Sequence, residues 1–512
     1  MLTLAAVLTT LHLTGDVPVE GGDYQLVPFD VPAGTVELTV AHDDGSAAQI
    51  LDWGVWAPDG CRGWGGGLGD AAVIGVAESS RGYTAGAIMP GTWYVVIGKA
   101  QLGGVPGHYT IDVEARDAAT LAPGQRAAWT PVVLSPARSW YAGDFHVHSS
   151  DSGDASAALD EIVDLAHQRG LDFVVLSDHN TVAQIPRLAA RQATLDDLLL
   201  VRGAEVTTYA GHANAIGIHA YVDHRVGQGG TSAATIAADV AGQDAILIVN
   251  HPELDLGEAC IGCAWRHADT PWARVAGLEI QTGNAALTDA IFTPRAIARW
   301  DALLDDGYLL AAIGGSDDHR AGRDTGGGAA RIGSPTTMVL ADELSEAALI
   351  AAVRAGRTVV KLHGPEDPMV ELTATDADVP ALGGGVGDTV RVASQLVLTA
   401  TVTGPMAEGA NAELWRDGAL VDSGVVHDGH VQFTRAVTGD RERYRVELYV
   451  AGARATVTSH VYVEGGAIAC ANGSDECGPG GCCDAGTPPT RATALAIALG
   501  ALALRRRRRA VV

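Results

Sequence analysis

Two histidines separated by one residue end an apolar stretch of this 512-residue chain, in the segment Asp144-Phe145-His146-Val147-His148. Side chains alternate across a strand, so a strand here would turn both imidazoles to the same face. Further segments with His, Asp or Glu follow at long intervals, each at or just past the end of an apolar run. They are 177–180, 205, 211–212, 250–252 and 316–319. The pattern predicts a multinuclear metal site at the C-terminal rim of a β/α barrel.

The length predicts several domains of ~150 residues each, so the metal site would occupy one part of the chain. The formal net charge is −27, and five of the positive charges lie together in residues 505–509. A nucleic-acid-binding domain normally carries a basic patch or stripe, and none is present in the body of the chain. A nucleic acid polymer is therefore excluded as a partner. A small phosphorylated or ester substrate is compatible with the acidic chain, because bound metal cations reverse the local field.

Two parts of the chain have the alternating apolar and polar pattern of β-domains. Residues 17–117 contain short alternating apolar runs between Gly, Pro and Asp clusters, which predicts an accessory β-sandwich without a catalytic role. Residues 118–138 are expected to be a linker. Residues 368–464 return to alternating runs and predict a second sandwich of immunoglobulin-like type.

Residues 139–367 alternate between strand and helix patterns. Residues 157–169 have apolar side chains on one helical face and Gly170 just past the end, which predicts a helix. A further helix is expected over 294–304. The continuous apolar runs typical of buried parallel strands are 172–177, 245–249, 276–280 and 309–313. Repeated units of this kind favour a parallel sheet or barrel.

Both ends of the chain carry features of an exported protein. Residues 1–16 include a short apolar run and are a candidate signal segment. Residues 465–512 contain four of the seven Cys, then a short apolar segment, then five Arg. This tail resembles the C-terminal sorting tails of myxobacterial exported proteins, which implies recognition by a sorting or processing machinery. We expect an extracellular or cell-envelope location, and the alternative for the tail is a disordered charged segment.

The ordered motifs of residues 139–367 resemble those of the PHP (polymerase and histidinol phosphatase) superfamily of metallohydrolases, and within it the CehA/McbA-like group. The matching segments are 143–149, 152–155, 170–173, 177–180, 203–205, 211–215, 250–252 and 315–319. The resemblance implies a multidomain protein with a central distorted β/α barrel of PHP type. Each segment alone is weak, but the ordered set is specific.

The resemblance also implies a ligand set for two or three divalent metal ions. His146 and His148 would hold the first metal with Asp317. Glu205 would bridge the first and second metals. The remaining ligands would be His212 and His251 at the second metal, and Asp154, His179 and His319 at a third metal or at a substrate oxygen. Imidazole and carboxylate ligands without thiolate suit Zn, Mn or Fe.

This ligand set predicts a hydrolase. A water held between two cations loses a proton near neutral pH, and the cations stabilise the developing oxyanion. His179 or His319 would protonate the leaving group if it binds no metal. A phosphoester is the preferred substrate, and a carboxyl or carbamate ester of the CehA type is the alternative. A third hypothesis is a cell-surface binding protein whose barrel is a relic.

Other residues have predicted supporting roles. Asp178 is expected to support the ligands rather than bind metal, and Glu279 to orient ligands or to cap a helix. Arg320 precedes a Gly-rich stretch and is predicted to contact an anionic substrate, with a plain flexible loop as the alternative. Cys260 and Cys263 are expected to form a local disulfide rather than a zinc knuckle or a redox motif.

Overall fold

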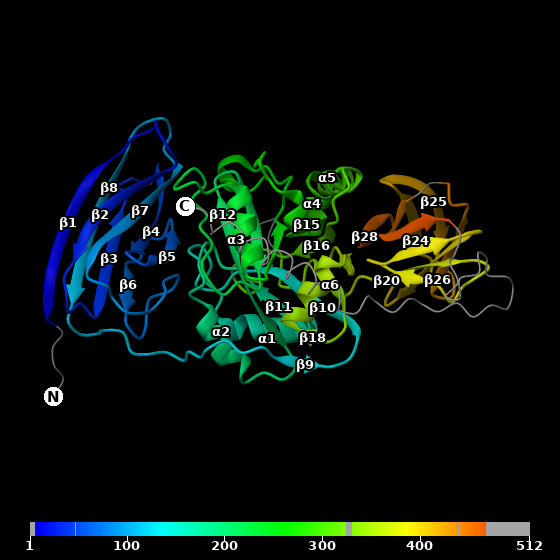
Figure 1. Ribbon diagram of the computed structural model, residues 1–512, viewed down its shortest axis with the longest axis horizontal. Coiled ribbons are helices and arrows are strands. Elements are labelled where there is room, and N and C mark those ends of the chain that lie inside the picture. The colour runs from blue at the N-terminus through cyan, green and yellow to red at the C-terminus, as the bar shows by residue number, and fades with distance from the viewer. Residues whose placement is uncertain (1–5, 47, 324–329, 439–440, 467–512) are drawn as a thin grey trace, which may run out of the picture.

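The computed structural model describes residues 6–46, 48–323, 330–438 and 441–466. Three parts follow one another along the long axis, with the N-terminal strands at one end and the C-terminal strands at the other (Figure 1). The mostly β, multidomain organisation that the sequence predicts is confirmed. Among these residues no helix is long and apolar enough to cross a membrane. The Cys-rich and Arg-rich tail predicted to be a sorting signal lies almost entirely outside the described residues.

The N-terminal part, called the β-domain below, consists of two four-stranded antiparallel sheets. Trp53 and Trp93 are fully buried in the apolar core of this domain. One sheet has the order β1-β8-β3-β6, with β1 (Val7–Val17), β8 (Gly107–Arg116), β3 (Glu37–Asp43) and β6 (Ala72–Gly75). The other has the order β2-β7-β4-β5, with β2 (Tyr24–Val31), β7 (Gly91–Gln101), β4 (Ile50–Ala57) and β5 (Gly60–Gly66).

Strand β1 occupies most of the candidate signal segment. It pairs with β8 from Val7 to Val17, and Val17 is fully buried. Removal of residues 1–16 would therefore take away an edge strand of the first sheet.

The central part alternates strands and helices. Its strands are β9 (Val133–Ser135), β10 (Ser139–Val147), β11 (Phe173–Leu176), β12 (Leu199–Thr208), β13 (Gly211–Ile216), β14 (Ile246–Val249), β15 (Val275–Thr282), β16 (Ala311–Gly315), β17 (Thr336–Ala341), β18 (Leu344–Ser345) and β19 (Thr358–Lys361). Its helices are α1 (Leu159–Arg169), α2 (Ile185–Gln192), α3 (Ala233–Gly242), α4 (Ala285–Ile291), α5 (Thr293–Asp305) and α6 (Glu346–Arg354), with short 3-10 turns at Gly257–Ala259 and Trp272–Arg274. The expected helices and buried strands form within two residues of the expected bounds.

Local sequence explains why α1 begins and ends where it does. The Glu161 carboxylate accepts a hydrogen bond from the backbone N–H of Ala158, which satisfies a donor at the N-terminus. Gly170 ends the helix with a φ of 66°, in the left-handed region that favours glycine. The helix then leads directly into β11, which pairs in parallel with β10. The residues that follow these two strands therefore lie close together.

The strands of the central part are not all parallel as expected. Strands β10, β11 and β12 run parallel, and so do β14, β15 and β16, but β13 runs antiparallel to both of its neighbours. The reason is a tight connection: only two residues separate β12 from β13, and a hairpin rather than a helical crossover forms. Strand β17 is also antiparallel to β10.

The two ends of this series of strands meet at one edge. The backbone N–H of Asp317, just after β16, donates to the carbonyl of His146 at 2.8 Å, and the backbone N–H of His148 donates to the backbone carbonyl of Asp318 at 3.0 Å. The buried Asp144 carboxylate accepts hydrogen bonds from the N–H groups of His146 and Ser316, both at 3.0 Å. These contacts place the end of β10 beside the segment that follows β16.

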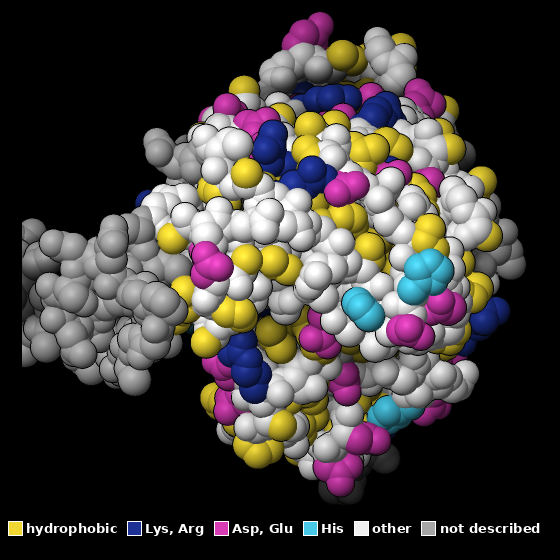
Figure 2. Space-filling model, turned by 90° about the vertical axis from the view of Figure 1, so that its right-hand side faces the viewer, with side chains coloured by type: hydrophobic (Ala, Val, Ile, Leu, Met, Phe, Trp, Pro, Cys, Tyr) yellow, Lys and Arg dark blue, Asp and Glu magenta, His cyan; other side chains and the backbone are white. Residues whose placement is uncertain are grey.

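The C-terminal part has a face-to-face pair of sheets around an apolar core that includes Leu398 and Val446. One sheet has the order β21-β20-β23-β26, with β21 (Gly384–Gly385), β20 (Met369–Asp376), β23 (Leu396–Thr403) and β26 (His430–Arg435). The other continues the central sheet through the pairing of β19 with β28 and contains β22 (Thr389–Val392), β24 (Asn411–Arg416), β25 (Ala419–Val425), β27 (Glu442–Val450), β28 (Ala453–Thr458) and β29 (Val461–Gly465). On the end of the molecule that this part forms, acidic, basic and hydrophobic side chains are interspersed (Figure 2).

A buried ion pair joins the central and C-terminal parts. Arg445 of β27 is 1% exposed and donates to Asp301 of α5 at 2.6 Å and to Glu447 at 2.8 Å. We expect Asp301→Ala to lower the free energy of unfolding by about 3 kcal/mol in urea titrations, because removal of one partner leaves a buried charge undercompensated. The control is Asp342→Ala, which removes an exposed pair with Arg138. Equal losses in the two variants would contradict this account.

Candidate metal centre

The predicted ligands gather at the edge where the strands of the central part end. His146 and His148 end or follow β10, Glu205 lies on β12, and His212 lies on β13. His179 follows β11, His251 follows β14, and Asp317 and His319 follow β16. The structure thus brings together the whole predicted ligand set, although Asp154 and His319 lie toward the open side. The β12–β13 hairpin places the start of antiparallel β13 at the same edge as the ends of the parallel strands.

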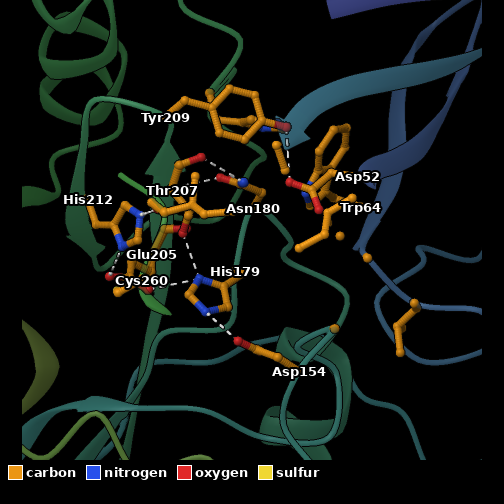
Figure 3. A pocket seen from close by; sticks show the side chains of 18 of the residues that line it. Asp52, Trp64, Asp154, His179, Asn180, Glu205, Thr207, Tyr209, His212 and Cys260 are labelled. Carbon is orange, nitrogen blue, oxygen red and sulfur yellow. Dashed lines mark hydrogen bonds and ion pairs between the residues drawn. The ribbon is translucent and has the colours of Figure 1, made fainter. Parts of the chain in front are cut away.

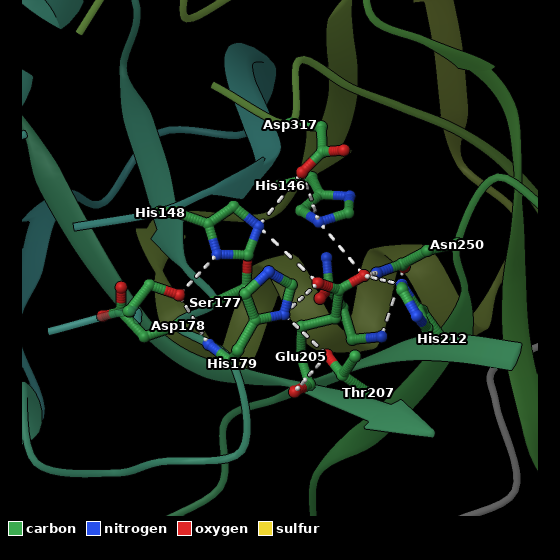
Figure 4. A network of polar contacts seen from close by, with 12 residues as sticks. His146, His148, Ser177, Asp178, His179, Glu205, Thr207, His212, Asn250 and Asp317 are labelled. Carbon is green, nitrogen blue, oxygen red and sulfur yellow. Dashed lines mark hydrogen bonds and ion pairs between the residues drawn. The ribbon is translucent and has the colours of Figure 1, made fainter. Parts of the chain in front are cut away.

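Glu205 is at the centre of the cluster and is fully buried (Figure 4). Its Oε1 lies 3.3 Å from His146 Nε2 and 3.5 Å from both His212 Nδ1 and His251 Nε2. Its Oε2 lies 2.8 Å from His179 Nδ1 and 3.6 Å from His148 Nε2. The two carboxylate oxygens therefore face two different groups of imidazoles, as a carboxylate that bridges two cations would.

Asp317, in the segment that follows β16, faces the same space. Its Oδ1 lies 3.3 Å from His146 Nε2 and 3.1 Å from His148 Nε2. Two ligand atoms that are each ~2.1 Å from one tetrahedral metal lie about 3.4 Å apart, so these separations fit a shared ion. The buried Nε2 of His146 makes no hydrogen bond of good geometry among the described residues. A cation between these groups would satisfy it.

A third group of side chains lies on the cavity side. Asp154 Oδ2 lies 3.3 Å from His179 Nε2 and 3.2 Å from His319 Nε2. The ring nitrogens of His148, His179 and His319 lie close enough together to hold an ion. The structure therefore contains buried His and carboxylate groups that could hold metal ions at more than one position.

The carboxylates of the cluster attract positive charge. Burial alone would lower the pKa values of His146 and His179, but the surrounding carboxylates, Glu205 among them, raise both well above the usual value. Burial opposes ionisation of Glu205, but the imidazoles of His146 and His179 outweigh it and hold the pKa of the carboxyl well below its usual value. Burial, followed by the charges of His319 and His179, lowers the pKa of His148 to about 3. Metal ligation requires ionised carboxylates and neutral imidazoles, so cations bound here would take the place of the protons on His146 and His179.

The outer ring nitrogens of the histidines are held by other groups. His146 Nδ1 donates to Glu279 Oε1 at 2.9 Å, and Glu279 Oε2 also accepts from the backbone N–H of His251 at 2.8 Å. His148 Nδ1 lies 3.2 Å from Ser152 Oγ. Of the two predicted roles for Glu279, the structure therefore supports orientation of ligands. These contacts leave the inner nitrogens directed at Glu205 and Asp317.

The loop closed by Cys260 and Cys263 orients two further ligands. The two cysteines form a disulfide with Cα atoms 5.6 Å apart. The backbone carbonyl of Ile261 accepts a hydrogen bond from His212 Nε2 at 3.2 Å, and that of Cys263 accepts one from His251 Nδ1 at 3.1 Å. The Cys-x-x-Cys spacing predicts the disulfide, but a role for its backbone carbonyls cannot be read from side-chain types.

Asp178 binds the protein rather than the cluster. It accepts hydrogen bonds from the backbone N–H of Ser149 at 2.6 Å and from its hydroxyl at 2.8 Å. Burial, and then the charge of Asp151, raise the pKa of Asp178 to about 7. Asp178 thus ties the loop after β10 to the end of β11, which agrees with a supporting role.

A cavity of about 660 Å³ opens beside the cluster (Figure 3). It is lined by His179, His212, His319 and other ligands, and also by side chains of the β-domain, including Asp52 and Trp64. Among the described residues that line it there is no Lys or Arg. Arg320 is exposed and does not line the cavity, so we do not assign it the predicted contact with substrate. Residues 324–329 of the Gly-rich stretch that follows Arg320 lie outside the described residues.

We expect Glu279→Gln to weaken metal binding by about 10- to 100-fold, because Gln can no longer accept a charge-assisted hydrogen bond from His146. The apparent Kd for Zn can be measured by competition with a chromogenic chelator. Glu371→Gln is the control, because Glu371 is exposed on β20. An unchanged Kd in the Glu279 variant would contradict the proposed orientation of His146.

Comparisons with known proteins do not place the chain in a family. No family model matches it, and no curated protein matches it. Similar solved structures include a calcium-binding mutant of Bacteroides uniformis beta-glucuronidase 2, at 10% identity over 91% of this chain and 61% of that chain, with a TM-score of 0.20. The apo structure of beta-glucuronidase 3 from the same organism has 9% identity over 88% of this chain and 64% of that chain, with a TM-score of 0.18. The chain spans less than two thirds of either, and likenesses this weak carry no argument.

Proposed function

We propose that the central part is a metal-dependent hydrolase of PHP type, and that it cleaves a phosphoester at a site for two or three divalent cations. The observation that carries the proposal is the position of Glu205, whose two carboxylate oxygens face separate groups of histidines. The ordered series of strands, whose first and last members meet at the ligand-bearing edge, agrees with the distorted barrel that the sequence resemblance implies.

The cations, when bound, would activate water and stabilise the negative charge that develops on the ester oxygens. His146, His148, His212, His251, Glu205 and Asp317 are the side chains that would hold them. Three divalent cations next to Glu205, Asp317 and Asp154 leave a net positive centre, which suits a phosphoryl group. Phosphoester cleavage is therefore the first proposal.

His179 and His319 are the residues suited to move a proton. Both line the cavity, and the Nε2 of each pairs with Asp154, the exposed carboxylate of the cluster. Although burial alone would lower it, Asp154 and Asp317 raise the pKa of His319 to about 9. If the third site holds no metal, a protonated His319 would protonate the leaving oxygen of the ester.

A carboxyl or carbamate ester is the second candidate. The observation that favours it is the absence of Lys and Arg from the described cavity lining. An uncharged ester needs no cation other than the metals, whereas many phosphate sites add an Arg or Lys.

A hydrolysis comparison separates the two. The full chain loaded with Mn or Zn is assayed with an aryl phosphomonoester, an aryl phosphodiester and a 1-naphthyl carbamate. His146→Ala is the test variant, and the exposed His219→Ala is the matched control. Turnover of a phosphate ester that only His146→Ala abolishes would support the proposal. Turnover of the carbamate alone would replace it with the second candidate, and no turnover would refute both.

A further inference from the structure

The β-domain forms one wall of the cavity beside the metal centre. Tyr24 of β2, Asp52 of β4 and Trp64 of β5 line it together with His179 and Asp154 of the central part. Figure 3 shows Asp52 and Trp64 on one side of the space and Glu205 and His212 on the other. The sequence predicts only an accessory role for this domain, so its place at the cavity needs an explanation.

Tight packing fixes this wall against the central part. The hydroxyl of Tyr209, in the β12–β13 connection, donates to Asp52 Oδ2 at 3.0 Å. A Cβ at Gly98 would overlap that hydroxyl, and a Cβ at Gly153 would overlap the carbonyl oxygen of Gly65. Thr181 just after β11 also donates to the carbonyl of Gly82 at 2.9 Å. The two parts therefore approach so closely along this seam that only glycine fits at two positions.

Aromatic and imidazole rings form much of the cavity lining at this wall. Trp64 of the β-domain contacts the imidazole of His224 of the central part edge-on with centroids 4.5 Å apart, and Tyr24 stacks on Tyr209 of the central part at 5.6 Å. Ile50 and Leu68 add apolar side chains at the partly exposed rim. A planar organic group would find both apolar contact and ring edges here.

Two polar groups at the wall, Asp52 of the β-domain and His224 of the adjoining central part, can accept hydrogen bonds from a ligand, and the described β-domain residues of the lining include no Lys or Arg. Asp52 is the carboxylate that this domain contributes to the cavity, and because burial raises its pKa to about 6, it is ionised at pH 8, where the test below is made. His224 is 1% exposed, burial lowers its pKa to about 3, and its Nε2 has no hydrogen-bond partner among the described residues. A ligand with a hydroxyl or amino group would satisfy these atoms, whereas an added phosphate or carboxylate would be repelled by Asp52.

We propose that the β-domain binds the alcohol part of the ester substrate, and that it selects an uncharged ring that carries a hydrogen-bond donor. The proposal rests on the function proposed above and narrows its substrate class. The phosphoryl group would lie at the metal centre, and the leaving alcohol would lie between Trp64, Leu68 and Asp52. Nucleoside diphosphates, sugar bisphosphates and other esters with a second anionic group are excluded.

The test uses product alcohols rather than turnover. The full metal-loaded chain is saturated with inorganic phosphate, so that the metal centre is occupied, and titrated with 4-hydroxybenzyl alcohol or with 4-hydroxybenzoate by calorimetry at pH 8. We expect the uncharged ring to bind at least on the order of tenfold more tightly, because Asp52 repels the carboxylate. Asp52→Asn should reduce this preference to about threefold or less.

Two further variants test whether misfolding, rather than the lost charge of Asp52, explains a reduced preference. Leu68→Lys, at the partly exposed rim, should strengthen binding of the carboxylate and reverse the preference. Asp30→Asn, an exposed substitution of the same kind in the same domain, should leave it unchanged. Equal binding of the two rings, binding of neither, or a preference that neither Asp52→Asn nor Leu68→Lys changes would overturn the proposal. Failure of the chain to hydrolyse any ester would instead refute the proposed function, and the titration would still report on the wall.

Discussion

Glu205→Gln is expected to abolish hydrolysis, with kcat/KM reduced at least about 10³-fold, because cation stabilisation of the transition state is worth several kcal/mol. Gln keeps the shape of the side chain and one oxygen for Asn250, which donates to Glu205 Oε1 at 2.7 Å. It loses the second ligand oxygen and the negative charge that face His148 and His179. Activity and metal content are measured on the same preparation.

The matched control for this prediction is Glu371→Gln, an exposed change of the same kind. The Glu205 variant should bind at least one metal equivalent fewer than the wild type, and the control should match the wild type. A Glu205 variant with full metal content and near-normal kcat/KM would contradict the bridging role of this carboxylate.

Removal of metal is expected to lower the midpoint of thermal unfolding of the central part by about 10 °C. A ligand present at 1,000 times its Kd stabilises the folded state by about 4 kcal/mol, which corresponds to a shift of this size in a domain of some 200 residues. Without cations, the buried imidazoles and carboxylates around Glu205 must take up protons or face one another uncompensated. Scanning calorimetry before and after chelation measures the shift.

Readdition of Zn or Mn should restore the midpoint in the wild type. His146→Ala should show a smaller response to chelation, because one ligand of the cluster is missing. A wild-type midpoint that changes by less than about 2 °C on chelation would show that the cluster binds no cation with useful affinity.

The sequence predicts the positions of the metal ligands better than it predicts the residues that line the rest of the cavity. His146 and His148 share a face because strand side chains alternate. The buried apolar runs place His179, His251 and Asp317 at strand ends that meet. Local periodicity therefore predicts that these residues lie at neighbouring strand ends, whereas which of them would bind metal is what the family resemblance implies. It does not foretell β13, since the two-residue connection to β12 makes a hairpin where a helical crossover is expected.

The wall of the cavity could not be predicted for a different reason. Asp52 lies in an ordinary alternating strand more than 100 residues before His179, and no motif links the two. Their approach depends on how two domains pack, at contacts such as those of Gly153 with Gly65 and of Tyr209 with Asp52. Arg320 illustrates the converse, since its neighbour His319 lines the cavity and Arg320 itself does not.

Metal content is the most direct test of the central claim that Glu205 and the surrounding histidines form a multinuclear cation site. The full chain is loaded with Zn or Mn, freed of excess metal by gel filtration and analysed by elemental mass spectrometry, with His219→Ala and His146→Ala in parallel. The account predicts two or three equivalents in the wild type and in His219→Ala, and at least one fewer in His146→Ala. Less than one equivalent in the wild type would contradict it and would favour a protein that does not use these residues for metal chemistry.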